Sequence, residues 1–170
     1  MNVELVPALE SDQPRLENLL ELYVHDFSEL LGLTPGEDGR FSYPKLPTYF
    51  REEGRAPFLL RADGRLSGFA LASRGSLVSG DPDVWDVSEF FVVRGVRRRG
   101  VGLAAAEALF RARAATWEVR VMDLNASARR FWDRTIEQVT EGRYTLEPWR
   151  REDGSPWHVF RFRSGNDAPR

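Results

Sequence analysis

An arginine-rich segment between residues 92 and 102 has the residue types and the spacing of an anion-binding site. Arg97, Gly100 and Gly102 follow the pattern R-x-x-G-x-G between an apolar run and a stretch of strong helix formers. A helix N-terminus offers free backbone N–H groups and a positive dipole end, and glycine lets a pyrophosphate approach the backbone closely. Neighbouring arginines can pair with further phosphates. The residues expected to form this phosphate site are Val92, Val93, Arg94, Arg97, Arg98, Arg99, Gly100, Val101, Gly102 and Leu103.

A dinucleotide-binding turn is one alternative for these glycines. Residues 100–105 also fit G-x-G-x-x-A, and Asp123 follows about 20 residues later, after the next predicted strand. However, six residues separate Val93 from Gly100, and four of them are arginines. A dinucleotide turn enters its glycines almost directly from the strand. A nucleic-acid patch or a solvated loop would also accommodate the arginines, but neither needs the glycines and the helix start.

The elements on either side of the segment predict how it is held. Residues 87–93 end in four successive apolar residues, which indicates a central strand covered on both faces. Residues 103–115 are nearly all strong helix formers, and residues 117–122 alternate as another strand. The segment therefore joins a strand to a helix within one βαβ unit.

The first third of the chain predicts a strand, a helix and a long loop. Residues 3–6 are apolar apart from Glu4, which predicts a short strand. Ser11 or Asp12 could cap a helix whose apolar residues, Tyr23 among them, recur at helical spacing. Residues 32–54 are rich in glycine, proline and charge, which predicts a loop with short helical turns. Such loops are expected to face a substrate.

Antiparallel pairing is expected before and after the βαβ unit. The Asp63-Gly64 step readily takes the positive φ angles of a tight turn, which predicts a β-hairpin from its apolar flanks. Asn125 can cap a further helix, and two more strands are expected over residues 143–146 and 157–162. This order of elements predicts the α/β (α+β) class, with a mixed central sheet and flanking helices.

The segment and its flanks resemble the acyl-CoA-binding motif of the GNAT (N-acetyltransferase) superfamily, and in particular a little-described bacterial branch of it. Arg97, Gly100 and Gly102 match the fixed positions of that motif. Val92 matches the strand position whose backbone faces the pantetheine arm, and Asn125 matches a pantetheine-facing asparagine. The resemblance is strongest from residue 89 to residue 132 and implies a GNAT fold with acetyl-CoA as the co-substrate.

The implied reaction is the transfer of an acetyl group to a primary amine by direct attack on the thioester. Such an amine has a pKa of about 10.4, so a base must first remove a proton. Glu89 and Asp86 precede Val92 by three and six residues, and the period of two puts them on opposite faces of a strand. We expect Glu89 to be the base, with a purely structural carboxylate as the alternative.

Trp132 is the second residue expected at the catalytic position, because many GNAT enzymes carry there a tyrosine that protonates the departing thiolate. An indole cannot serve as that acid, so another group or water must do so, and a core role for Trp132 stays open. Tyr23 and His25 are the residues expected to contact the acceptor, although His25 could equally be an ordinary surface histidine. A catalytically silent GNAT-like domain that binds acyl-CoA is the alternative function.

Composition restricts the partners and the compartment. At 170 residues the chain fits one domain, expected over residues 1–165 with a polar tail at 166–170. The net charge of −2 argues against nucleic acid or an acidic membrane surface as a partner. One lysine, two histidines and no cysteine argue against a Schiff base, a metal site or a disulfide, and they favour the cytoplasm. The expected partner is a small-molecule or peptide amine, and the sequence leaves a homodimer open.

Overall fold

Seven strands of the described chain pair in the order β1-β2-β3-β4-β5-β7-β6. The computed structural model describes residues 1–165, and the expected tail at 166–170 lies outside the described residues. The chain divides into two compact units. The first contains Met1–Leu71 and Glu89–Gly102, and the second contains Ala72–Ser88 and the described residues from Leu103 onward. Among the described helices, none is both long enough and apolar enough to cross a bilayer.

The first unit contains the hairpin and the long helix that the sequence predicts. β1 (Val3–Pro7) pairs antiparallel with β2 (Arg55–Ala62), and β3 (Arg65–Arg74) follows after a two-residue turn. Asp63 and Gly64 in that turn have φ angles of 49° and 76°, as the tight hairpin turn requires. A short 3₁₀ turn (Glu10–Asp12) leads into α1 (Gln13–Leu31), and α2 (Thr48–Arg51) is the only helical turn of the expected loop in the described residues.

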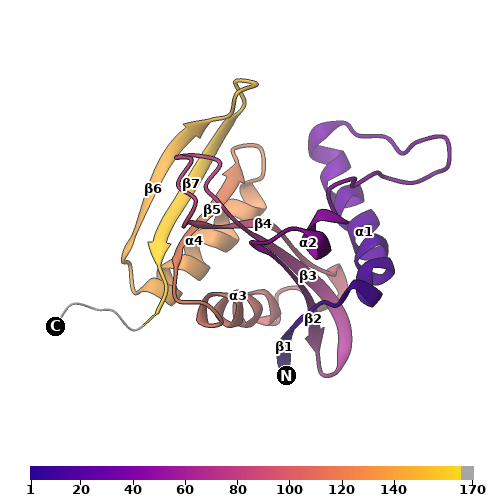
Figure 1. The fold of residues 1–170 in the computed structure, drawn as a ribbon, viewed down its shortest axis with the longest axis horizontal. Helices are drawn as coiled ribbons and strands as arrows, with labels where there is room; N and C mark the ends of the chain where they lie inside the picture. Colours follow the sequence, from indigo (N-terminus) through magenta and orange to yellow (C-terminus); the bar gives the residue numbers. More distant parts are fainter. Residues whose placement is uncertain (166–170) are drawn as a thin grey trace. The chain divides into compact units, whose positions relative to one another are not determined.

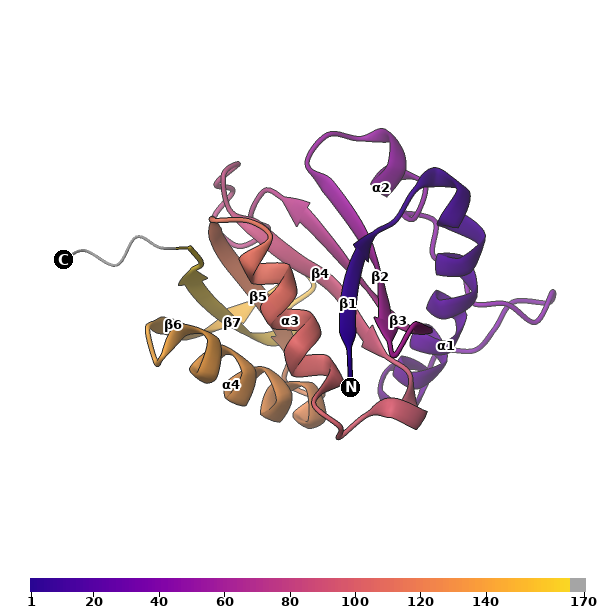
Figure 2. The ribbon, with the colours of Figure 1, turned by 90° about the horizontal axis from the view of Figure 1, so that it is seen from below.

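The core of the first unit lies between α1, α2 and the strands β2 to β4. Leu16, Leu19 and Leu20 repeat at helical spacing on α1 and are all buried. They pack in one cluster with Phe69 of β3 and Phe91 of β4. In Figures 1 and 2, α1 and α2 lie on the same side of β2 and β3. Each large apolar side chain buried there stabilises the fold by about 1.5–3 kcal/mol, which fixes α1 against the strands.

A glycine lets β3 approach the end of β4 (Trp85–Val92) very closely. A Cβ atom on Gly68 would lie only 2.0 Å from the carbonyl oxygen of Phe91. Beside this contact, Val93, which directly follows β4, donates its N–H to the carbonyl of Ser67 at 2.9 Å. No residue other than glycine fits this position without moving the backbone, because the obstructing atom is itself main chain.

The second unit contains the parallel part of the βαβ unit and the C-terminal hairpin. β4 pairs parallel with β5 (Thr116–Met122), which confirms the predicted connection through α3 (Val101–Arg111). β5 pairs antiparallel with β7 (Pro156–Arg163), and β7 with β6 (Tyr144–Arg150). The predicted helix over residues 103–115 is wrong at both ends, because α3 begins two residues earlier and ends at Arg111.

Aromatic side chains join the helices of the second unit to its strands. Phe110 of α3 contacts Trp117 of β5 and Phe162 of β7, with ring centroids 5.2 and 4.9 Å apart. It also contacts Trp132 of α4 (Ala126–Thr140) at 6.3 Å. The two helices run side by side in both views (Figures 1 and 2). Ring pairs of this kind contribute about 0.5–1.5 kcal/mol each beyond the area they bury.

Candidate active site

The arginine-rich segment leaves β4 at Val92 and enters α3 at Val101. A 3₁₀ turn (Arg94–Val96) follows the strand, and the backbone then adopts positive φ angles at Arg98 (62°) and Gly100 (80°). The first N–H groups of α3 have no partner within the helix, and they carry the positive end of its dipole. This backbone geometry is suited to an anion, and binding of a phosphate at these residues stays a prediction. We call residues 92–102 the cofactor loop, after the role that the resemblance implies for them.

One carboxylate on α1 holds two arginines of the cofactor loop. Asp26 accepts hydrogen bonds from Nε of Arg94 at 3.0 Å and from a terminal nitrogen of Arg97 at 2.6 Å. Arg97 also donates through Nε to the carbonyl of Val92 at 2.6 Å. Burial raises the pKa of Asp26, but the hydrogen bonds from Arg94 and Arg97 outweigh it and lower that pKa below its usual value.

Arg98 and Arg99 differ from their neighbours in the cofactor loop. Both side chains belong to exposed residues, and neither residue forms an ion pair within residues 1–165. The loop therefore contains two arginines that are already neutralised in part by Asp26 and two that are not. The unpaired guanidinium groups are the ones available to an incoming phosphate.

Both oxygens of the Glu89 carboxylate accept hydrogen bonds from phenols. Tyr23 of α1 donates to Oε2, and Tyr43 donates to Oε1 at 2.8 Å. Burial is the main cause that raises the pKa of each tyrosine above its usual value, and the negative charge of Glu89 adds to it. The structure therefore brings together two residues that the sequence singles out, Tyr23 and Glu89, and adds Tyr43 to them.

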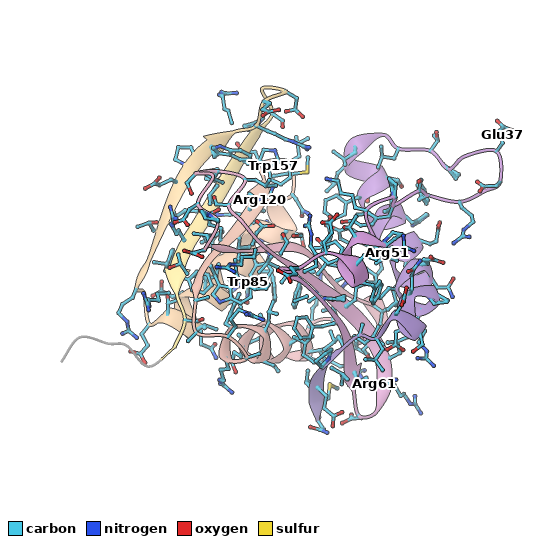
Figure 3. The ribbon with its side chains drawn as sticks, in the orientation of Figure 1. Glu37, Arg51, Arg61, Trp85, Arg120 and Trp157 are labelled. Carbon is cyan, nitrogen blue, oxygen red and sulfur yellow. The ribbon has the colours of Figure 1, made fainter. Side chains whose placement is uncertain are left out.

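Tyr43 belongs to the segment between α1 and α2, which is otherwise anchored by Glu21. That glutamate accepts from the N–H of Phe41 at 2.8 Å and from Nε of Arg40 at 3.4 Å. Glu37 lies at the tip of the segment, well out from α1 (Figure 3). A cavity of about 600 Å³ lies between α1 and this segment. Its lining includes Glu17, Glu21, Val24, Asp38, Phe41 and Tyr43.

Asp86, the other carboxylate that the sequence considers, is fully occupied in the second unit. Arg120 of β5 donates to both of its oxygens, at 2.7 and 3.0 Å, and Ser88 donates to Oδ2 at 2.9 Å. Asp86 is 1% exposed. The guanidinium of Arg120 lies 5.9 Å from the ring centroid of Trp157, and Figure 3 labels both side chains. Removing one partner of such a buried ion pair strongly destabilises the fold, because it leaves the other charge buried without compensation.

The remaining predicted residues are placed as follows. The side chain of Asn125 accepts from the N–H of Ala128 at 2.9 Å, which confirms it as the N-cap of α4. Trp132 is 6% exposed and packs in the core beside Phe110. Leu103 lies in the first turn of α3. His25 is exposed on α1 and meets the edge of Phe41, with ring centroids 6.3 Å apart.

Comparison with known proteins decides the family. The sequence profile of the acetyltransferase (GNAT) family matches residues 16–136. The chain belongs to the GNAT family. Acetyl transfer is the chemistry of that family, and acetyl-CoA is its co-substrate. Among curated proteins, none matches this GNAT chain.

Solved structures confirm the GNAT fold. An acetyltransferase from Thermus thermophilus superposes with a TM-score of 0.69 at 19% identity, over 96% of this chain and 97% of that one. The ribosomal-protein-S18-alanine N-acetyltransferase from Escherichia coli gives 0.60 at 17% identity, over 98% and 99% of the two chains. The aminoglycoside acetyltransferase AAC(6')-Ib in complex with coenzyme A gives 0.63 at 16% identity, over 93% and 94%.

Proposed function

We propose that this GNAT protein transfers an acetyl group from acetyl-CoA to a primary amine by direct attack of the amine on the thioester. The observation that carries the proposal is the cofactor loop, which leads from β4 into the N-terminus of α3 and follows a carboxylate, Glu89, on the same strand. The loop supplies an anion site, and Glu89, three residues before Val92, supplies a base. The reaction needs both.

In this mechanism the cofactor loop binds the pyrophosphate of acetyl-CoA. The N–H groups at the start of α3 and the guanidinium groups of Arg98 and Arg99 supply the positive potential. Gly100 allows the backbone to turn at a φ of 80°, which a side chain would strain. The main chain of Val92 is the group that we assign to the pantetheine arm.

Glu89 is the base in this mechanism. The amine arrives as an ammonium ion, transfers one proton to the carboxylate, and its nitrogen then forms a bond to the thioester carbon. The carbon–sulfur bond breaks, and coenzyme A leaves as a thiolate. The nitrogen must then lose a second proton to become the amide, and the thiolate must gain one. Because Trp132 carries no acidic proton and lies in the core, we assign the transfer of this proton from the nitrogen to the thiolate to water. Tyr23 and His25 of α1 are the acceptor contacts, and the acceptor is a small-molecule or peptide amine.

The proposal is tested by release of coenzyme A in the presence of a panel of primary amines. Acetyl-CoA should bind in the micromolar range by calorimetry, NAD should not bind, and at least one amine should raise thiol release above the rate without amine. Equal binding of NAD would favour the dinucleotide alternative. Gly102→Asp should abolish acetyl-CoA binding in a folded protein, because it adds bulk and negative charge at the start of α3.

A silent acyl-CoA-binding domain is the second candidate, and Trp132 is the observation that favours it. A GNAT domain that lacks the acidic tyrosine could retain the cofactor loop as a ligand site alone. Binding of acetyl-CoA without thiol release for any amine in the panel would support this role. Release with one amine would exclude it.

A further inference from the structure

We propose that Asp26 is a positioning residue for the cofactor loop, and that Arg94 and Arg97 act through it rather than as phosphate ligands. The proposal rests on the proposed binding of acetyl-CoA at this loop. It assigns the contacts with phosphate to Arg98, Arg99 and the backbone. The R-x-x-G-x-G motif alone would assign Arg97 to the phosphates, so the structure divides the four arginines differently from the pattern.

The contacts of Arg97 are the first step of the argument. Its Nε donates to the carbonyl of Val92 and a terminal nitrogen donates to Asp26, both at 2.6 Å. The same guanidinium lies 5.5 Å from the ring centroid of Phe91. The side chain of Arg97 is 40% exposed, but turning its planar guanidinium towards a phosphate would disrupt these three contacts. Arg97 therefore ties the last carbonyl of β4 to α1.

The contacts of Arg94 are the second step. Its Nε and one terminal nitrogen both approach Oδ1 of Asp26, at 3.0 and 2.8 Å, while Arg97 occupies Oδ2. The two arginines thus bracket a single carboxylate, one on each oxygen. Arg94 is the first residue of the 3₁₀ turn from Arg94 to Val96, and Arg97 directly follows that turn. Asp26 therefore holds both ends of the turn.

Asp26 should then have two opposite effects on a bound polyanion. The negative charge of Asp26 repels phosphate, so by this effect alone the removal of Asp26 would tighten binding. The gain would be small, because charges on an exposed loop are well screened. Its hydrogen bonds fix the loop, and by this effect its removal would misplace the N–H groups that face the phosphate. We expect the second effect to win, so the sign of the change identifies the role.

The test is the dissociation constant of acetyl-CoA, measured by calorimetry on the full chain. Asp26→Asn should weaken binding about tenfold, as expected for loss of charge-assisted hydrogen bonds. Glu29→Gln is the matched control, because Glu29 is an exposed acid on the same helix that acts on Arg94 through its charge. The control should bind as tightly as the wild type or slightly more tightly. Tighter binding by Asp26→Asn would overturn the proposal.

Salt dependence separates the two pairs of arginines. Removing a phosphate ligand lowers the slope of log Kd against log salt concentration, whereas removing a positioning residue shifts the line without changing its slope. Arg98→Gln and Arg99→Gln should reduce the slope, and Arg94→Gln and Arg97→Gln should keep it. A reduced slope for Arg97→Gln equal to that of Arg98→Gln would contradict the assignment.

Rescue and turnover distinguish positioning from general instability. Asp26→Glu keeps the carboxylate and should bind acetyl-CoA with part of the wild-type affinity. This result is expected even if Asp26→Asn unfolds at the temperature of the assay. With an accepted amine, Asp26→Asn should raise the KM for acetyl-CoA and leave kcat within about twofold of the wild type. Equal affinity of Asp26→Glu and a folded Asp26→Asn would overturn the proposal. Failure of the wild type to bind acetyl-CoA would instead overturn the proposed function.

Discussion

Tyr43 donates a hydrogen bond of 2.8 Å to Oε1 of Glu89, which follows it by 46 residues in the chain. Most residues near Tyr43 between α1 and α2 are exposed, whereas Tyr43 itself packs against the core of the first unit. The phenol therefore ties the exposed segment between the helices to the carboxylate that we propose as the base. Tyr23 completes this arrangement from α1 by donating to the other oxygen.

Tyr43→Phe should lower the free energy of unfolding by about 1.5–3 kcal/mol, the usual contribution of a hydrogen bond to a charged group. It should also raise the KM of the amine, because the segment after α1 would lose an anchor. Tyr144→Phe, in the second unit, is the control and should change the free energy of unfolding by less than about 1 kcal/mol, since that tyrosine pairs near the surface with Glu137. Urea unfolding measures both changes, and equal effects would argue against the Glu89 contact.

Alkaline pH should destabilise the protein through the same two phenols. Burial and the charge of Glu89 raise the pKa of Tyr23 and Tyr43 in the folded state, whereas the unfolded value stays near 10. Below about pH 10 both states keep the proton, so their stabilising contribution is complete. Above it the folded state binds more protons, and the free energy of unfolding should fall by about 1.4 kcal/mol per pH unit for each tyrosine.

Urea unfolding between about pH 8 and pH 11, a range that brackets the ordinary tyrosine pKa, checks this dependence. Tyr43→Phe should reduce the alkaline slope by about one tyrosine's share, or about 1.4 kcal/mol per pH unit. The chain contains a single lysine, Lys45, so few other groups titrate in this range. A slope that is the same in both proteins would mean that Tyr43 ionises normally when folded.

Much of the fold is predictable from the sequence because its signals are local. The Asp63-Gly64 step fixes a tight turn, Asn125 caps a helix, and the leucines of α1 recur at helical spacing; each depends on a few neighbouring residues. The helix after the cofactor loop is predicted wrongly at both ends. Residues 112–115 are strong helix formers, but the chain must leave α3 at Arg111 to begin β5.

The contacts of the candidate site are harder to predict because they join distant residues. Tyr43 and Asp26 act on groups 46 and 71 residues away, and no spacing rule reports such pairs. In the sequence, Tyr43 is one aromatic residue in a loop rich in glycine and proline, and Asp26 is simply the neighbour of His25. The sequence therefore predicts which segments carry chemistry, but not how their side chains pair.

Gly68→Ala should be one of the most destabilising single substitutions in the first unit. A Cβ atom there would lie 2.0 Å from the carbonyl oxygen of Phe91, so β3 or β4 must move. The free energy of unfolding should fall by about 2–4 kcal/mol, in the range for overpacking and strain in a core. Gly64→Ala is the matched control: it meets no atom within 4 Å and carries only the strain of a φ of 76°. Comparable losses in the two variants would contradict the close approach of the strands.

Glu89→Gln tests the base directly. The amide is nearly isosteric and cannot take the proton, so kcat should fall by about 10²- to 10⁴-fold while the affinity for acetyl-CoA changes little. The acidic limb of the pH–rate profile should change as well, since the group whose ionisation controls it is gone. Asp86→Asn is a necessary comparison, because it leaves the guanidinium of Arg120 without its buried partner and should cost about 3–5 kcal/mol of stability. Two results together would contradict the assignment of Glu89 as the base. Glu89→Gln would keep wild-type turnover with an accepted amine, and a folded Asp86→Asn would lose turnover with the same amine.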